Sequence, residues 1–303
     1  MSHKPLILFP SDYTNKRTVD SNFDGEYQAV TGQPNLSIAL FDQRAFDEQG
    51  IVQVEHECDP TLAPVTLYRG WMMKPEQYNS FYQQLDALGM RLITNPTEYA
   101  NLHLFPRSYD KLIGVTPKTL IFMDNDVSYE KVVAEFDRFI IKDYVKSVKG
   151  FDFPVPIESS INKDEFDALL EKFRYFRGDL FTGGFVFKQF VNYKKYDVTT
   201  NEWRCFFLHQ RILTLARNSG QHKTCPSPSR DLLAFCSRLD SPYYTVDFAE
   251  LEDGSWVVIE TGDGQVSGLA SEEDPAIYFM RLAEDLPLAP NLNYPKFSDS
   301  CLW

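Results

Sequence analysis

Apolar and polar positions divide this 303-residue chain into two alternating kinds of segment. Runs of four to eight apolar residues predict buried strands, and apolar residues three or four positions apart predict amphipathic helices. Strands are predicted over 5–10, 65–73, 91–94, 139–147, 183–191, 243–250 and 255–261, with a strand pair over 202–219 that turns at His209–Arg211. Helices are predicted over 75–89, 128–139, 162–176, 229–239 and 272–285.

This alternation of strands and helices is typical of an α/β protein. Local signals support several boundaries: Pro75 and Gly89 suit the two ends of one helix, and Ser128 suits the N-cap of the next. The segment "GVTPKTL" at 114–120 interrupts the pattern and predicts a boundary between lobes. The tail over 290–303 is broken by proline and is expected to wrap around the surface.

Composition and charge narrow the class of protein. With 43% hydrophobic and 24% charged residues the chain is expected to fold, and its length allows two or three lobes. The formal charge of −13 argues against nucleic acid or an anionic membrane as the main partner. No apolar stretch approaches eighteen residues, so no membrane span is predicted.

The cysteines indicate neither a metal site nor a disulfide framework. Their number is odd, they form no CxxC pair and no secretory signal precedes them, which favours free thiols in a reducing compartment. The expected location is therefore cytoplasmic. The five residues are Cys58, Cys205, Cys225, Cys236 and Cys301.

Several charged residues interrupt the predicted strands. Lys142 and Lys146 are four positions apart in one strand, so a period of two places both on one face with Tyr144 between them. Arg204 follows Glu202 by two positions and shares its face. The other interruptions are Lys188, Arg217, Asp247 and Glu260.

Buried charges need a partner or a ligand. A solvated sheet face explains any one of these residues, but together they describe a basic floor beside an acidic rim. Such a surface would hold a polyphosphate through the cations and Mg²⁺ through the acids. Neither GxxxxGK[ST] nor GxGxxG occurs in the chain, which argues against a Walker-type or Rossmann-type phosphate site.

The stretch "IETGDGQVSGL" over 259–269 follows an apolar run with two acids and three glycines. A plain turn needs fewer glycines and no particular acid. A site for metal-bound phosphate would use both, because glycine lets the backbone approach a ligand closely.

Taken in order, the motifs from about residue 114 to 270 resemble the ATP-grasp superfamily. "GVTPKT" resembles the entry to the small ATP-binding lobe, "FIIKDYVKS" the strand whose lysine contacts the phosphates, and "FKQFV" the hinge strand beside the adenine. "EWRCFFLHQRILTLAR" resembles the entry to the large lobe, and "VDFAELEDGSWVVIETGDG" the strand pair with the Mg²⁺ ligands. The chain resembles in particular a bacterial and phage clade of ATP-grasp ligases, itself distantly similar to the eukaryotic chaperone that assembles translation initiation factor two.

The resemblance implies an α/β (α+β) ATP-grasp fold, in which two α+β lobes clasp ATP behind an N-terminal α/β pre-ATP-grasp lobe. The implied lobes are an N-terminal acceptor lobe over 1–113, a small ATP-grasp lobe over 114–192, and a large ATP-grasp lobe with a C-terminal tail over 193–303.

The resemblance also implies a role for each charged residue of the strands. The residues that would contact ATP are Lys142, Lys146, Lys188, Gln189, Phe190, Val191 and Glu202. Catalysis would rest on Lys142, Arg204 and Arg217. The Mg²⁺ ligands would be Asp247, Glu260 and Asp263, the last in place of the asparagine in the superfamily's usual Glu-x-Asn ending. The usual glycine-rich phosphate lid is reduced here to Gly150.

In the N-terminal lobe, Arg69 is expected to be exposed after a strand and before Gly70. It would bind a substrate carboxylate, or it would pair with an acid of the protein. His103 is a weaker candidate, because a single histidine is more often structural.

Three functions remain open at this point. The first is an ATP- and Mg²⁺-dependent carboxylate–amine ligase that acts through an acyl-phosphate on small-molecule, peptide or protein substrates; positioning and charge neutralisation suffice for such catalysis. The second is an assembly or chaperone role in which nucleotide is bound without ligation. The third is phosphotransfer, which needs a base near the acceptor hydroxyl.

Overall fold

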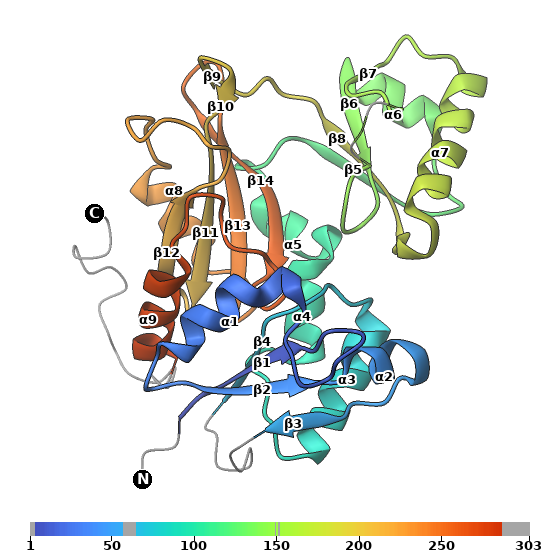
Figure 1. Ribbon diagram of the computed structural model, residues 1–303. Helices are drawn as coiled ribbons and strands as arrows, with labels where there is room; N and C mark the ends of the chain where they lie inside the picture. The colour runs from blue at the N-terminus through green and yellow to red at the C-terminus, as the bar shows by residue number, and fades with distance from the viewer. Residues whose placement is uncertain (1–3, 57–64, 149, 151, 287–303) are drawn as a thin grey trace.

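The computed structural model describes residues 4–56, 65–148, 150 and 152–286, which form three four-stranded sheets and a small hairpin (Figure 1). The first sheet has the order β3-β2-β1-β4, with β1 parallel to β2 and β4 and β3 antiparallel at the edge. Its strands are β1 (Leu6–Pro10), β2 (Ser37–Phe41), β3 (Val54–His56) and β4 (Thr66–Tyr68). The helices beside it are α1 (Asp24–Thr31), α2 (Gln43–Gln49) and α3 (Pro75–Ala87). A 3-10 turn, η1 (Ser21–Phe23), precedes α1.

Two short helices connect this sheet to the rest of the chain. They are α4 (Pro96–His103) and α5 (Phe105–Leu112), and both lie against strand β14 of the large sheet. The start of α4 is fixed by a capping box in which Asn95 and Glu98 exchange side-chain and backbone hydrogen bonds.

The central lobe is a separate sheet with the order β5-β8-β6-β7. Its elements are β5 (Thr119–Met123), α6 (Tyr129–Glu135), β6 (Arg138–Lys142), β7 (Ile157–Glu158), α7 (Lys163–Arg177), η3 (Gly178–Leu180) and β8 (Gly184–Gln189). Seven phenylalanines make up much of its core: Phe136, Phe139, Phe153, Phe166, Phe173, Phe185 and Phe187. The described residues of this core all come from the central lobe, which stands to one side in Figure 1.

The large sheet is antiparallel, with the order β12-β11-β13-β14. Its strands are β11 (Glu202–Leu208), β12 (Arg211–Arg217), β13 (Tyr243–Glu250) and β14 (Trp256–Asp263). Helices α8 (Arg230–Cys236) and α9 (Pro275–Asp285) belong to the same part of the chain, and a small hairpin of β9 (Lys195–Tyr196) and β10 (Thr199–Thr200) leads into β11. Figure 1 shows α9 beside α1 on one face of this sheet.

One hydrophobic core is shared by the first sheet and the large sheet. Ile7 and Phe9 of β1 pack in the same cluster as Phe206 of β11, Tyr243 of β13 and Tyr278 of α9. The implied N-terminal lobe and large lobe are therefore joined by buried apolar surface. The lobe boundaries after residues 113 and 192 remain a prediction.

The prediction of an α/β (α+β) fold is confirmed, but several predicted elements are shorter. The strand over 65–73 ends at Tyr68, the helix over 128–139 ends at Glu135, and the strand over 139–147 ends at Lys142. The segment 91–94 is not a strand, because only Leu92 forms a bridge, opposite Thr66. The predicted turn between β11 and β12 is confirmed, with His209 and Gln210 at positive φ.

Some predictions concern residues outside the described part of the chain. The tail over 290–303 falls there, as do Cys58 and Cys301. The other three cysteines are free, as predicted, and all three are buried. Among the described helices, none combines the length and apolar character that crossing a membrane requires.

Candidate functional site

Strand register places three charged residues in one row across the large sheet. Arg204 on β11 is directly opposite Asp247 on β13, and Asp247 is directly opposite Glu260 on β14. Directly opposed residues point to the same face, so the three side chains are neighbours. Arg204 donates to both oxygens of Asp247, at 2.8 and 2.7 Å, and also to the carbonyl of Gly268.

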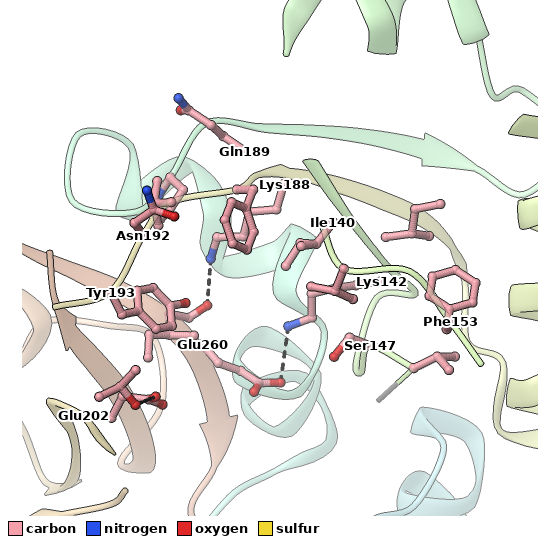
Figure 2. A pocket seen from close by; sticks show the side chains of 18 of the residues that line it. Ile140, Lys142, Ser147, Phe153, Lys188, Gln189, Asn192, Tyr193, Glu202 and Glu260 are labelled. Atoms are coloured by element: carbon pink, nitrogen blue, oxygen red, sulfur yellow. Dashed lines mark hydrogen bonds and ion pairs between the residues drawn. The ribbon is translucent and has the colours of Figure 1, made fainter. Parts of the chain in front are cut away.

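Two lysines of the central lobe approach this row from across the cleft. The ammonium groups of Lys142 and Lys146 each lie 3.4 Å from the same oxygen of Glu260. Figure 2 shows the contact between Lys142 and Glu260. Burial opposes ionisation of Glu260, but Lys142 and Lys146 outweigh it and hold the pKa of this carboxyl at about 2. Glu260 is thus a carboxylate at neutral pH.

Lys146 reaches Glu260 in a different way from the one predicted. A continuous strand was expected to place Lys142 and Lys146 on one face, but β6 ends at Lys142. The chain then reverses, and Ser147 forms an antiparallel bridge with Lys142. The two lysines meet because of a turn and not because of strand alternation.

Lys188 is a third cation at the same place. It is buried in β8, donates to the carbonyl of Ile259 at 2.6 Å, and lies 4.7 Å from the ring centre of Phe105. Burial, and then the nearby charge of Lys142, lower the pKa of Lys188 well below its usual value. Figure 2 shows Lys142 and Lys188 directed toward the large sheet from neighbouring strands.

Lys142, Lys188 and Glu260 border a cavity of about 1000 Å³ between the central lobe and the large sheet, and Lys146, Arg204 and Asp247 lie next to them. The hinge residues Gln189, Phe190 and Val191 form part of its wall, as does Glu202, which accepts a hydrogen bond from Thr200. In Figure 2 the side chain of Gln189 points away from the other labelled residues, and it is exposed. A cavity of this size takes a nucleotide-sized ligand.

Sequence reasoning missed several residues of the cavity wall. They come from the segment after β6, from the β9–β10 hairpin and from the two residues before it: Ser147, Phe153, Tyr193, Lys194, Lys195 and Thr200. The basic pair Lys194–Lys195, a few residues after the hinge strand, was a signal that could have identified the hairpin.

Asp247 and Glu260 are the acids available for a metal. No group of three or more His, Cys, Asp or Glu side chains gathers as a metal site within the described ranges. Mg²⁺ is usually held by one or two carboxylates together with substrate phosphates and water, so two acids beside a group of lysines suit it.

The structure does not bring Arg217 to this row. On the β11–β12 ladder Arg217 is opposite Trp203, and Ala216 is opposite Arg204. Arg217 and Arg204 therefore point to opposite faces of the sheet. The guanidinium of Arg217 lies 5.9 Å from the ring centre of Trp203.

Asp263 is also separated from the other two acids. Strand β14 continues through Asp263, so this residue and Glu260, three positions apart, point to opposite faces. Asp263 is fully buried, and one of its oxygens accepts from the backbone of Gln265. Its other oxygen has no hydrogen-bond partner among the described residues. The position two residues after Glu260 is Gly262, which has no side chain to bind a metal.

Burial raises the pKa of Asp263 to about 7, against the hydrogen bonds from Gln265 that lower it. The unfolded carboxyl titrates near 3.9, so the folded state binds this proton more tightly. Asp263 should therefore contribute stability that is present at low pH and is lost as the pH rises from about 4 to about 7. The difference in unfolding free energy between wild type and Asp263→Asn, from urea titrations, should fall by about 1 kcal/mol per unit between pH 5 and 7. A difference that does not change with pH would contradict this.

Arg69 was expected to be exposed, and this is wrong. Its side chain is 1% exposed and forms a two-pronged ion pair with Glu26 at 2.7 and 2.9 Å. It also donates to the carbonyl of Gly264 and lies over the rings of Phe206 and Tyr278. Arg69 thus joins the first sheet to the large sheet and presents no free cation to a substrate.

His103 is buried and structural, as the weaker assignment anticipated. It stacks on Tyr99, with 4.7 Å between ring centres. Burial, reinforced by the charge of Lys146, lowers the pKa of His103 to about 4, so the ring is neutral at neutral pH.

The fold and the site together define a protein with a nucleotide-sized cavity between two α+β lobes, bordered by cations from one and acids from the other. Residues 130–282 match the ATP-grasp domain, R-2-K clade family 3, which is half of the chain, and the chain belongs to this family. The expectations of an ATP-dependent ligase that forms a C–N bond, with ATP and Mg²⁺ as cofactors, are confirmed at the level of the family.

Solved structures share the fold over nearly their whole length. The RimK domain ATP-grasp protein from Sphaerobacter thermophilus has a TM-score of 0.58 at 13% identity, covering 92% of this chain and 98% of that one. D-alanyl-alanine synthetase A from Vibrio cholerae has 0.57 at 11%, covering 94% and 97%. The ATP-grasp ligase PsnB, bound to a phosphomimetic variant of its minimal precursor, Mg and ADP, has 0.53 at 14%, covering 94% and 98%. The comparison with curated proteins finds no match.

Proposed function

We propose that this protein joins a carboxylate to an amine at the cost of ATP, through an acyl-phosphate. The observation that carries the proposal is the row Arg204–Asp247–Glu260 facing Lys142 and Lys146. In this reaction a carboxylate oxygen takes the γ-phosphoryl group and ADP leaves. The amine nitrogen then attacks the acyl carbon, a C–N bond forms, and phosphate and a proton are released.

The proposed nucleotide site extends along the cavity, from the hinge residues 189–191 to the row Arg204–Asp247–Glu260. The exposed side chain of Gln189 leaves the backbone of Gln189, Phe190 and Val191 to border the adenine. Glu202 lies on the Arg204 face of β11 and is placed to accept from the ribose hydroxyls. Lys142, Lys146 and Lys188 would contact the phosphates.

Asp247 and Glu260 are the residues that would hold Mg²⁺. When bound, the metal neutralises phosphate charge as a Lewis acid. Arg204, held by Asp247 and by the carbonyl of Gly268, would stabilise charge on the transferred phosphoryl group. The protein supplies no covalent nucleophile in this scheme, and its residues act by binding, orienting and neutralising.

The roles of three earlier candidates change in this proposal. Arg217 and Asp263 point away from the row, and Arg69 is committed to Glu26. None of the three is assigned to catalysis, metal or substrate. The neighbour PsnB was solved with a precursor peptide, which keeps a peptide carboxylate or amine beside small molecules as the proposed substrates.

ADP release is the direct test. The purified protein is incubated with ATP, Mg²⁺ and libraries of carboxylates, amines and short peptides, and ADP is measured with each component omitted in turn. ADP formation that needs both a carboxylate and an amine supports ligation. Transfer of labelled phosphate to an acceptor without any amine would favour a phosphotransferase. Tight ATP binding with no turnover for any pair would favour the assembly role.

Mg²⁺ and nucleotide should bind cooperatively. Without nucleotide, Glu260 is paired with two lysines and Asp247 with Arg204, so a lone Mg²⁺ must compete with these cations. Phosphates offer the cations new partners and free the acids. Calorimetry should therefore show Mg²⁺ affinity about tenfold or more higher with ADP present than without it, and Mg²⁺ should raise ADP affinity by the same factor. Equal Mg²⁺ affinity in both titrations would contradict this.

A further inference from the structure

Asp143, directly after Lys142, is a buried acid to which neither the cavity nor the proposed chemistry assigns a role. Its side chain is fully buried, and its carboxylate accepts four hydrogen bonds. One oxygen accepts from the backbone of Val145 and Lys146, at 2.7 and 2.6 Å. The other accepts from the guanidinium of Arg177 at 2.8 Å and from the backbone of Thr182 at 3.3 Å. Asp143 does not border the cavity.

The hydrogen bonds of Asp143 close the turn that brings Lys146 to Glu260. The backbone of Asp143 also donates to the carbonyl of Lys146 at 3.0 Å. In a continuous strand, residues four positions apart are separated by roughly 13 Å. Here the ammonium groups of Lys142 and Lys146 reach the same oxygen of Glu260. The chain reversal at Asp143 accounts for that convergence.

The turn is held from two sides. Arg177 is the last residue of α7, and its guanidinium also donates to the carbonyl of Leu180. On the other side, the carbonyl of Tyr144 accepts from the backbone of Phe105, the first residue of α5. Without the carboxylate, the guanidinium of Arg177 and three backbone donors would lose their acceptor, which is costly in a buried place.

We infer that Asp143 is a positioning residue, which fixes Lys146 at the phosphate end of the nucleotide cavity through the turn 143–146 without touching the nucleotide. The inference rests on the proposed function, because it assumes that Lys146 contacts phosphate. A carboxylate suits the task because it accepts several hydrogen bonds at once and is neutralised by Arg177. Asparagine keeps the shape but loses one acceptor oxygen and the charge.

A double-mutant cycle tests the inference. Dissociation constants for a non-hydrolysable ATP analogue and for adenosine are measured in wild type, Asp143→Asn, Lys146→Met and the double variant. Lys146→Met should weaken binding of the ATP analogue about tenfold, as expected for one lost charge-assisted hydrogen bond. Asp143→Asn should weaken binding of the analogue between about threefold and tenfold. The double variant should be no more than about twofold weaker than Lys146→Met, because both changes remove the same contact.

The affinity for adenosine distinguishes a loss of lysine positioning from general damage to the fold. Adenosine lacks phosphates, so all four proteins should bind it within about twofold of one another. Asp124→Asn is the matched control. Asp124 accepts a hydrogen bond at 3.0 Å from Arg174 of α7, the helix that also carries Arg177, but takes no part in the turn 143–146. This variant should bind the ATP analogue like wild type. Should Asp143→Asn fail to fold, Arg177→Met removes one anchor of the turn and should show the same selectivity with a smaller loss.

The outcomes distinguish two failures. If Lys146→Met leaves the affinity for the ATP analogue unchanged, or wild type does not bind it, the proposed nucleotide site is wrong and the inference falls with it. If Lys146→Met weakens binding but Asp143→Asn does not, only the role of Asp143 is wrong. The positioning role would also be wrong if the double variant lost affinity for the ATP analogue by the product of the two single losses. It would be wrong too if Asp143→Asn weakened adenosine binding as much as it weakened binding of the analogue.

Discussion

Glu260→Gln is expected to lose at least about 100-fold in Mg²⁺-dependent ADP formation while the fold is retained. The amide keeps the size of the side chain but carries no charge for the metal. It also leaves Lys142 and Lys146 without their shared acid, so the cleft gains positive charge. The measurement is the rate of ADP release with a substrate pair found in the omission assay, together with calorimetry of Mg²⁺ in the presence of ADP.

Glu252→Gln is the control for this variant. Glu252 borders the same cavity but is not bonded to Lys142 or Lys146. It should retain activity within about threefold, because an exposed charge contributes little. Normal Mg²⁺-dependent turnover in Glu260→Gln would place the metal site elsewhere.

Arg69→Met is expected to destabilise the protein by about 3 kcal/mol or more, because removing one member of a buried ion pair leaves the other charge uncompensated. Glu26 would lose both of its hydrogen bonds from the guanidinium, and the carbonyl of Gly264 would lose a donor. Urea denaturation monitored by circular dichroism measures the loss.

Two further variants identify the cause of that loss. Arg44→Met removes an exposed arginine that pairs with Glu48 four residues later, and should cost no more than about 0.5 kcal/mol. The double variant Arg69→Met with Glu26→Gln should be more stable than Arg69→Met alone, because the unpaired charge is gone. A loss for Arg69→Met as small as that for Arg44→Met would mean that Arg69 does not join the sheets.

The part of the chain that matches the ATP-grasp domain, residues 130–282, could be predicted well from its sequence. Charges inside apolar strands are rare enough that Lys142, Lys188, Asp247 and Glu260 were identifiable, and the order of motifs supplied the fold. All four residues lie in strands, where an apolar run makes a charged residue conspicuous. Only the pairing of β11, β13 and β14 shows that Arg204, Asp247 and Glu260 form a row.

Strand arithmetic decides one of two misplaced candidates. Extending β14 to Asp263 puts this residue on the face opposite Glu260. Regular pairing outward from Leu208 and Arg211 would put Arg217 opposite Glu202, on the Arg204 face, and only the bulge between Phe206 and Phe207 moves it opposite Trp203. The capping box at Asn95 likewise signalled α4, which was not predicted.

Arg69 and Lys146 could not be placed in the same way. The partner of Arg69, Glu26, lies 43 positions away in a helix that was not predicted. The turn at Asp143 depends on Arg177 and Thr182, 34 and 39 positions later. Both are tertiary contacts, and a local period carries no information about them.

The two segments that connect the central lobe to the rest of the chain lie side by side. The lobe is entered at β5 and left at the end of β8, where Thr119 is opposite Lys188 and the backbone of Gln189 donates to the carbonyl of Lys118 at 2.8 Å. An inserted lobe whose two ends are adjacent is tethered to the rest of the protein at one place, so we expect it to move about that place as a rigid body. Each opening movement would therefore part Lys142, Lys146 and Lys188 from the Glu260 strand together, so that the cavity opens and closes as a unit.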